Sequence, residues 1–250
     1  MLTLRVDSAD IEWMASRTLL SYGDDRGSKQ SQFWVLLALS GVIATAGVAS
    51  DSTATVIGAM IVAPLMTPIL GTAFSLVLAD RSRMARSFLV VLGGVLLVVA
   101  IGYGAGLLEP LDTLTDANAQ VTGRVSPKLI DLIAALATGL VGAFALVRAD
   151  IADTLPGVAI SISLVPPLAV AGLTLEEGKT DQAWGALLLF ATNLTAIIFT
   201  ATLVLLAYRV RETAADSGYP VGRLSGFTLS AVMGLVALIA VPLGYGTRRS

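Results

Sequence analysis

The chain has 250 residues, of which 55% are hydrophobic and only 14% are charged, and its mean hydropathy is +0.82. Soluble domains carry about a quarter charged residues, so this composition indicates an integral membrane protein, and the formal charge of -2 points to no nucleic-acid partner. The absence of cysteine and histidine excludes disulfides, thiol nucleophiles, serine–histidine proteases and any zinc or haem site built on those residues.

The first predicted element is a short amphipathic helix at 8–22, "SADIEWMASRTLLSY". Ile11, Met14 and Thr18 fall on one stripe of this helix. Two arrangements fit the pattern: the helix lies along the membrane surface with Trp13 among the headgroups, or it packs on the protein itself. The sequence leaves both open.

Seven hydrophobic segments follow, separated by polar breaks. A spanning helix needs roughly 20 mostly apolar residues, and long runs without strict alternation exclude a β-barrel. The segments lie at about 33–50, 54–79, 87–108, 129–147, 155–175, 184–207 and 225–246. We therefore predict an all-α polytopic transmembrane helical bundle of about seven spans over residues 31–250, preceded by a short cytoplasmic segment at 1–30.

Charged loop residues predict the orientation of these spans. Lysine and arginine accumulate in cytoplasmic loops. With seven spans, eleven of the 16 basic residues fall on the side of the N-terminus and five on the other. The N-terminus is therefore expected in the cytoplasm.

Two of the segments contain prolines in similar surroundings. Aligning Pro64 with Pro167 places "MIVAPL" (60–65) over "SLVPPL" (163–168). Each motif lies in the second span of a three-span unit, and the units cover about 33–108 and 129–207. The chain thus divides into three spans, three spans and an extra span.

An odd-numbered unit that is repeated enters the membrane from opposite sides, so the pattern predicts a 3+3 inverted repeat. In such proteins, helices broken by glycine or proline meet near the midplane and form a substrate site. The alternative is a simple kink, because proline and glycine are common in membrane helices and neighbouring groups satisfy the freed backbone.

Three stretches together resemble a known family: "FWVLLALSGVIATAGVASDSTATVIGAMIVAPLMTPILG" (33–71), "LPGVAISISLVPPLAVAG" (155–172) and "LLLFATNLTAII" (187–198). They are similar to the prokaryotic membrane family described as domain of unknown function 389. The resemblance covers about residues 30–210. It implies a multi-span protein of the prokaryotic cytoplasmic membrane, and no settled activity.

Asn193 is the most suggestive polar residue, because it lies near the middle of an apolar segment. A buried membrane amide is either interhelical glue, worth roughly 0.6 kcal/mol on average, or a ligand-facing group near Pro64 and Pro167. Either Asp51 or Ser52 is expected to cap the second span; the other interpretation of Asp51 is that it lines an external vestibule.

Thr67, Ser161 and Ser163 lie close to the prolines. Their hydroxyls either bond back to the preceding turn or contact a solute. Met60 and Met66 are expected to pack against other side chains rather than bind a metal. The full set of candidate pathway residues is Asp51, Pro64, Thr67, Pro68, Ser161, Ser163, Pro166, Pro167 and Asn193.

The functional expectation is a transporter or channel for a small solute or ion, without cofactor or metal. An enzyme is disfavoured because no acid pair lies inside the spans. The alternative is a non-catalytic membrane scaffold, or an assembly or sensor protein, without transport activity. A scaffold would use small-residue faces between subunits, here Gly102/Gly106 and Gly139/Gly142. In either case we expect membrane lipids and further copies of the chain as partners.

Overall fold

The computed structural model describes residues 6–20, 23, 25–108, 118–148 and 164–222. In these ranges the chain forms helices and turns without a strand, so the predicted all-α fold is confirmed there. The helices are α1 (Ser8–Thr18), α2 (Arg26–Ala49), α3 (Thr53–Val62), α4 (Met66–Val77), α5 (Arg81–Leu108), α6 (Ala119–Thr122), α7 (Leu129–Val147), α9 (Val165–Glu176), α10 (Thr180–Ala207) and α11 (Val210–Asp216).

Four helices, α2, α5, α7 and α10, are long and apolar enough to cross a membrane. The pair α3 and α4 adds a fifth candidate span, bent by 49° at its break, and α9 is a shorter apolar helix. The chain is therefore a membrane-spanning protein. The predicted span 225–246 and the first part of the span 155–175 lie outside the described residues.

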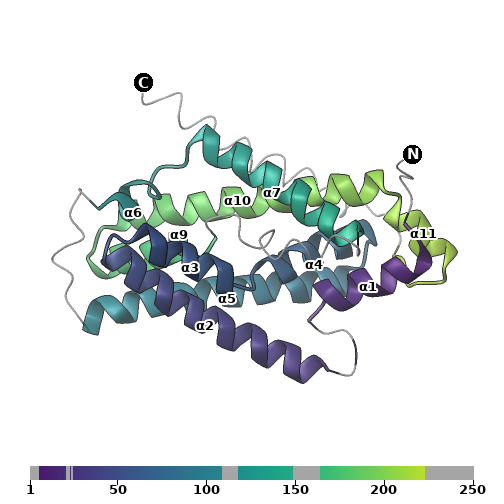
Figure 1. Cartoon of the computed structure of the whole chain (residues 1–250), viewed down its shortest axis with the longest axis horizontal. Helices are drawn as coiled ribbons and strands as arrows, with labels where there is room; N and C mark the ends of the chain where they lie inside the picture. Colours follow the sequence, from purple (N-terminus) through teal and green to yellow (C-terminus); the bar gives the residue numbers. More distant parts are fainter. Residues whose placement is uncertain (1–5, 21–22, 24, 109–117, 149–163, 223–250) are drawn as a thin grey trace.

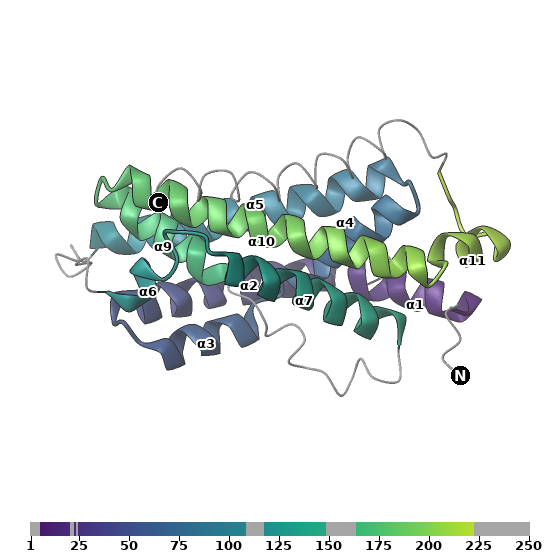
Figure 2. The same ribbon diagram turned by 90° about the horizontal axis from the view of Figure 1, so that it is seen from above.

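The long helices run between two ends of the bundle (Figure 1). At one end α4, α7 and α10 finish, α2 and α5 begin, and α1 and α11 lie beside them (Figures 1 and 2). We call this the arginine-rich end, because Arg81, Arg83, Arg86, Arg209 and Arg211 belong to it. At the opposite end, α2, α5 and α9 finish, and α3, α7 and α10 begin.

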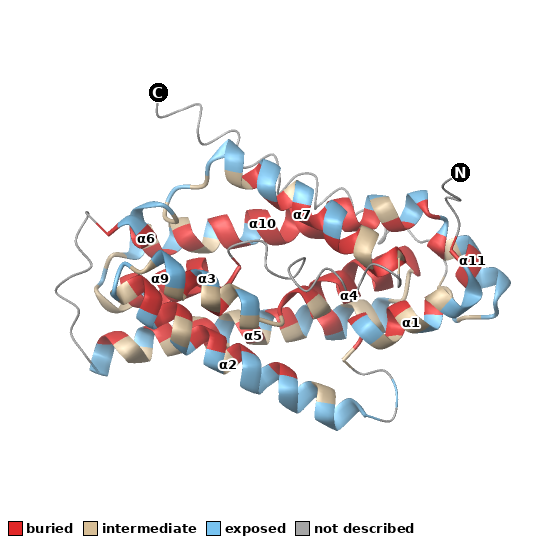
Figure 3. Cartoon of the chain, in the orientation of Figure 1, coloured by how far each residue is buried: buried red, intermediate tan, exposed pale blue. Residues whose placement is uncertain are grey.

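The core of the bundle is formed by two short apolar helices, α4 and α9, together with α10. Residues 165–174 of α9 are all buried, and so is every residue of α4 except Thr67. A helix that is apolar on all sides has to be enclosed, and α5 and α10 each pack against both of them. The outer faces of α2 and α5 expose apolar side chains (Figure 3), such as Leu96, 71% exposed, as expected for a lipid contact.

The N-terminal helix packs on the protein. Ile11, Met14 and Thr18 are buried, as the predicted stripe requires, and α1 contacts α4, α7 and α11. The carbonyl of Thr18 lies directly against Gly71 of α4, where a Cβ atom would clash with it. Of the two arrangements that the sequence left open, the described structure has the second.

Candidate functional site

The break between α3 and α4 is produced by Pro64. Proline has no backbone N–H and clashes with the preceding turn, and α3 ends at Val62, two residues before it. The chain resumes its helix at once: the N–H of Thr67 donates to the carbonyl of Pro64 (3.2 Å) and the N–H of Ile69 to the carbonyl of Leu65 (3.3 Å). The break is therefore only three residues long.

The other prolines begin helices rather than kink them. Pro68 lies in the first turn of α4, and Pro166 and Pro167 lie in the first turn of α9. Proline is tolerated in a first turn, because the N–H groups there have no partner within the helix. The expectation of a broken span is thus met at α3–α4. In the fifth span only the second half, α9, is described.

Contacts along α5 locate the start of α4. A Cβ atom on Gly71 would lie 3.1 Å from Ser87 Oγ, and one on Gly94 would lie 3.2 Å from the side chain of Leu65. The middle of α4 therefore lies near the second turn of α5. The first turn of α4 lies near Gly94, in the middle of α5.

Contacts with α5 also show where α9 lies in the bundle. A Cβ atom on Gly102 would lie 2.8 Å from the carbonyl oxygen of Ala169, and one on Gly106 would lie 2.6 Å from Glu176 Oε2. Helix α9 therefore runs from the middle of α5 toward the opposite end of the bundle, whereas α4 runs toward the arginine-rich end. Figure 1 shows the two on either side of the centre.

The N-terminal ends of α4 and α9 thus approach one level of the bundle from opposite directions. Gly94 and Gly102 are about 12 Å apart along α5, at 1.5 Å per residue. Val165, the first residue of α9, lies one helical turn before Ala169. Measured along α5, Val165 is therefore within roughly 6 Å of the level of Leu65. The positive ends of two helix dipoles therefore face the same central region.

The two hairpins, α4–α5 and α9–α10, have equal lengths. Helices α4 and α9 contain 12 residues each, and α5 and α10 contain 28 each. Because α4 and α9 start at Met66 and Val165, and α5 and α10 at Arg81 and Thr180, both pairs are offset by the same 99 residues.

The connecting turns match as well. Ala79 and Gly178 occupy the left-handed region, with φ of 54° and 75°. The next residue in each turn, Asp80 or Lys179, donates its N–H to the carbonyl five residues earlier at 2.9 Å. The turns are therefore built in the same way, with alanine adopting the conformation that favours glycine.

This offset corrects the alignment expected from the sequence. It pairs Pro167 with Pro68, not with Pro64, so the predicted register is wrong by four residues, about one helical turn. It also pairs Asn193 of α10 with Gly94 of α5. In the α9–α10 hairpin, Val165 lies 11 residues before the last residue of α9 and Asn193 lies 13 residues after the first residue of α10, so Asn193 is near the level where α9 begins.

Asn193 is 2% exposed, and its Oδ1 has no hydrogen-bond partner in the described part of the chain. The neighbouring threonines are satisfied locally: Thr192 donates to the carbonyl of Leu188 (2.8 Å) and Thr195 to that of Ala191 (2.7 Å). Leaving a buried acceptor unpaired costs about 1–3 kcal/mol. Asn193 is thus a buried amide near the central level whose Oδ1 accepts no hydrogen bond from any residue that the structure describes.

The remaining predicted residues divide into three groups. Asp51 accepts a hydrogen bond from the Gln120 N–H (3.1 Å) and thereby holds α6, while Ser52 caps α3 by accepting from the Thr55 N–H (3.3 Å). Thr67 is half-buried beside the break. Ser161 and Ser163 lie outside the described residues.

The glycine faces expected between subunits are used within the chain. Gly102 packs against α9, and Gly139 packs against Ile197 of α10. Gly142 contacts the terminal methyl of Met66. The interpretation of these faces as assembly surfaces is therefore wrong, because close helix packing inside the protomer already covers them.

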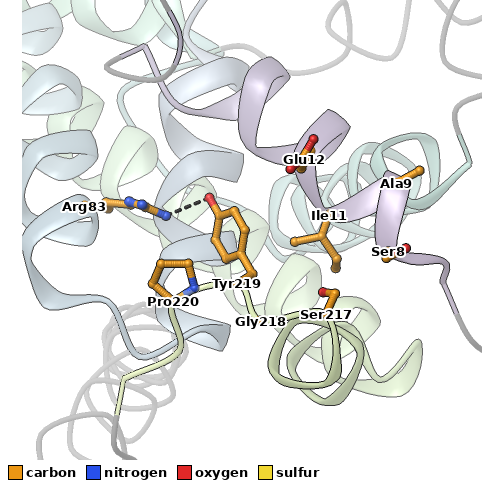
Figure 4. A pocket seen from close by; sticks show the side chains of 9 residues that line it. All are labelled: Ser8, Ala9, Ile11, Glu12, Arg83, Ser217, Gly218, Tyr219 and Pro220. Atoms are coloured by element: carbon orange, nitrogen blue, oxygen red, sulfur yellow. Dashed lines mark hydrogen bonds between the residues drawn. The ribbon is translucent and has the colours of Figure 1, made fainter.

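A cavity of about 620 Å³ lies away from this level, between α1 and the loop after α11 (Figure 4). Arg83 points into it and donates to the hydroxyl of Tyr219 (2.7 Å), and its Nε lies 3.2 Å from Asp80 Oδ2. Its guanidinium is therefore already bound by two protein groups. The cavity is a feature of the arginine-rich end rather than of the centre.

A second cavity, of about 240 Å³, touches Pro68 and contains Arg86, Ser87 and Gln30. Sequence reasoning used Arg86 only to orient the spans and did not consider the other two. No local pattern marks them, because the cavity forms only when α1 and α2 pack beside α5.

Comparison with known proteins places the chain in a family. The family model described as "Domain of unknown function (DUF389)" matches residues 60–199, so the chain belongs to that family. It is 30% identical over 199 residues to the uncharacterized protein MJ0678 of Methanocaldococcus jannaschii, a match that covers 80% of this chain and 61% of the relative. The chain therefore spans about three fifths of that relative's length. No solved structure matches.

Proposed function

We propose that this member of the DUF389 family is a transporter or channel that passes a small solute or ion through the central level where α4 and α9 begin. The observation that carries the proposal is the pair of apolar half-helices that start at this level and run to opposite ends of the bundle. Irregular backbone at membrane depth is tolerated where it is buried in protein or lines a cavity. A pair of interrupted helices at matching positions is the recurring design of transporter sites.

The proposal includes an inverted repeat of three spans and three spans followed by a seventh. The equal lengths and common offset of the two hairpins support it, as does the opposite direction of α4 and α9. In such a design Asn193 and Thr67 contribute polar contacts from the described residues, and Ser161 and Ser163 are candidates for the same role. No catalytic step is part of this proposal.

The electrostatics of the centre favour an anion or a neutral solute over a cation. Both half-helices present the positive ends of their dipoles, and half-helix dipoles of this polarity exclude cations in known pores. Pro68, Pro166 and Pro167 remove N–H donors from the two first turns. A site with a favourable potential but few donors holds a solute weakly, which suits passage rather than storage.

The orientation follows from the two ends of the bundle. We propose that the arginine-rich end and α1 face the cytoplasm of a prokaryotic cell, because basic residues are retained on that side. Among the basic residues of the described loops, Arg124, Lys128 and Lys179 belong to the opposite end. The protein then lies in the cytoplasmic membrane with its α9–α10 turn outside.

The test is flux through purified protein in liposomes. We expect chloride, nitrate or a small neutral solute such as glycerol to cross faster than in protein-free vesicles, and potassium and sodium not to. Fluorescent ion indicators and osmotic swelling measure the two classes. Vesicles that remain as tight as the protein-free control to every solute would contradict the transport proposal. A potassium-selective flux would contradict the electrostatic argument.

A further inference from the structure

The second cavity has the composition of a headgroup site. It lies between the end of α1, the start of α2 and the second turn of α5, and Pro68 of α4 forms part of its wall. Its polar side chains are Arg86, Ser87, Gln30 and Thr18, whose hydroxyl donates to the carbonyl of Met14 (2.7 Å), and its apolar wall includes Leu20 and Leu89. A cationic group and an apolar wall therefore share one opening of about 240 Å³.

Arg86 differs from its neighbours at the same end of the bundle. Arg83 pairs with Asp80, Arg209 pairs with Glu212, and Arg211 donates to two backbone carbonyls. Within the described residues, Arg86 has neither an ion pair nor a hydrogen bond from its side chain, and it is exposed. Among those residues, no group occupies the donors of its guanidinium.

Two further donors lie beside it. The Ser87 hydroxyl and the Gln30 amide make no side-chain hydrogen bond to any described residue. Guanidinium groups bind phosphate through two parallel N–H bonds, and such charge-assisted bonds are about twice as strong as neutral ones. Three groups that can donate hydrogen bonds to phosphate oxygens therefore line the same cavity.

The position of the cavity selects a lipid as the source of that phosphate. Arg81 and Arg83 precede it at the boundary of α5, and the helix becomes continuously apolar after Ser87. Leu89, on the cavity wall, is 63% exposed on the lipid-facing surface. A molecule bound here has its phosphate at Arg86 and apolar protein surface beside its chains, as in the basic pockets that hold anionic headgroups.

We propose that this cavity binds the headgroup of an anionic phospholipid, with Arg86 as its principal ligand and Ser87 and Gln30 as additional donors. The bound lipid contacts Pro68 in the first turn of α4, and it bridges α1 to α5. It therefore supports the packing of α1 on the half-helix. The site does not depend on what crosses the centre of the protein.

Native mass spectrometry of the full chain in detergent tests this site, with phosphatidylglycerol and phosphatidylcholine as probes. We expect phosphatidylglycerol to bind in preference, and Arg86→Gln to weaken it about tenfold, the effect of one charge-assisted interaction. Arg81→Gln is the matched control, since it removes the same charge from the same helix end but outside the cavity. Its phosphatidylglycerol binding should match that of the wild type.

Three results would overturn the proposal. Equal losses in Arg86→Gln and Arg81→Gln would mean that general charge attracts the lipid. Equal binding of phosphatidylglycerol and phosphatidylcholine would mean that the cavity does not select anionic lipids. Displacement of phosphatidylglycerol by millimolar glycerol 3-phosphate would identify a soluble phosphate compound as the ligand instead.

Discussion

Replacing Asn193 with leucine is expected to lower solute flux strongly without lowering the stability of the protein. The buried Oδ1 has no hydrogen-bond partner in the described structure, so leucine breaks no hydrogen bond to that atom there and relieves the cost of an unpaired acceptor. A passing solute, by contrast, loses a polar contact at the level where α9 begins. We expect flux in liposomes to fall by about tenfold or more, the equivalent of about 1.4 kcal/mol.

The control for this variant is Thr202→Val in the same helix. Thr202 is also buried, but its hydroxyl donates to the carbonyl of Ile198 (2.7 Å) more than two turns away from the central level. Its flux should match the wild type. If Asn193→Leu lowers the melting temperature and leaves flux intact, the amide is interhelical glue, and the pathway role of Asn193 is wrong.

Gly102→Ala is expected to be the most destabilising of the small substitutions in α5. A Cβ atom at this position would lie 2.8 Å from the carbonyl oxygen of Ala169 and 3.2 Å from the Cα of Gly172. These are backbone atoms, which cannot move aside as a flexible side chain can. Overpacking of this kind costs about 1–3 kcal/mol, and it would separate α5 from the first turns of α9.

Gly104→Ala is the matched control, two residues along the same helix. A Cβ atom there meets nothing within 4 Å, so the higher helix propensity of alanine should leave stability unchanged or raise it by up to about 1 kcal/mol. Thermal unfolding of the detergent-solubilised variants, followed by tryptophan fluorescence, gives the comparison. Similar melting temperatures for both variants would show that α5 and α9 are not in backbone contact.

The long helices could be predicted from the sequence, because hydropathy and polar breaks are local. The segment 129–147 coincides with α7 (Leu129–Val147). The segments 87–108 and 184–207 end where α5 and α10 end, although both helices start earlier, at Arg81 and Thr180. Hydropathy locates the apolar stretch, whereas the polar first turns are also helical and lie beyond it.

The alignment of the half-helices could not be predicted reliably, because one proline resembles another in a sequence. Pro64 breaks the chain and Pro68 begins a helix, and only the bounds of α4 and α9 distinguish the two roles. The backbone segments that pack against the glycines could not be predicted from the sequence either, for a related reason. Gly102 and Gly139 are small in any context, and which backbone approaches them depends on the packing of helices distant in sequence.

Asn193 shows how far sequence reasoning reaches at the candidate site. A lone amide in an apolar segment is visible as an anomaly, and its burial was expected. Its level in the bundle was not derivable from hydropathy. It follows from the α9–α10 hairpin, in which Asn193 and Val165 lie nearly the same number of residues from the connecting turn.

The most direct test of the central claim is whether water reaches the level where α4 and α9 begin. The chain contains no cysteine, so a single introduced cysteine gives an unambiguous signal with a hydrophilic, membrane-impermeant thiol reagent. Asp181→Cys should react in intact cells, and Ser82→Cys only after permeabilisation, which also tests the orientation. Leu96→Cys, on the lipid-facing surface, should stay unreactive.

We predict that Thr67→Cys and Asn193→Cys react with the same reagent from at least one side of the membrane. Their labelling should be slower in the presence of the transported solute. If both remain as unreactive as Leu96→Cys after permeabilisation, the central level is dry, and α4 and α9 are packing elements rather than the walls of a pathway.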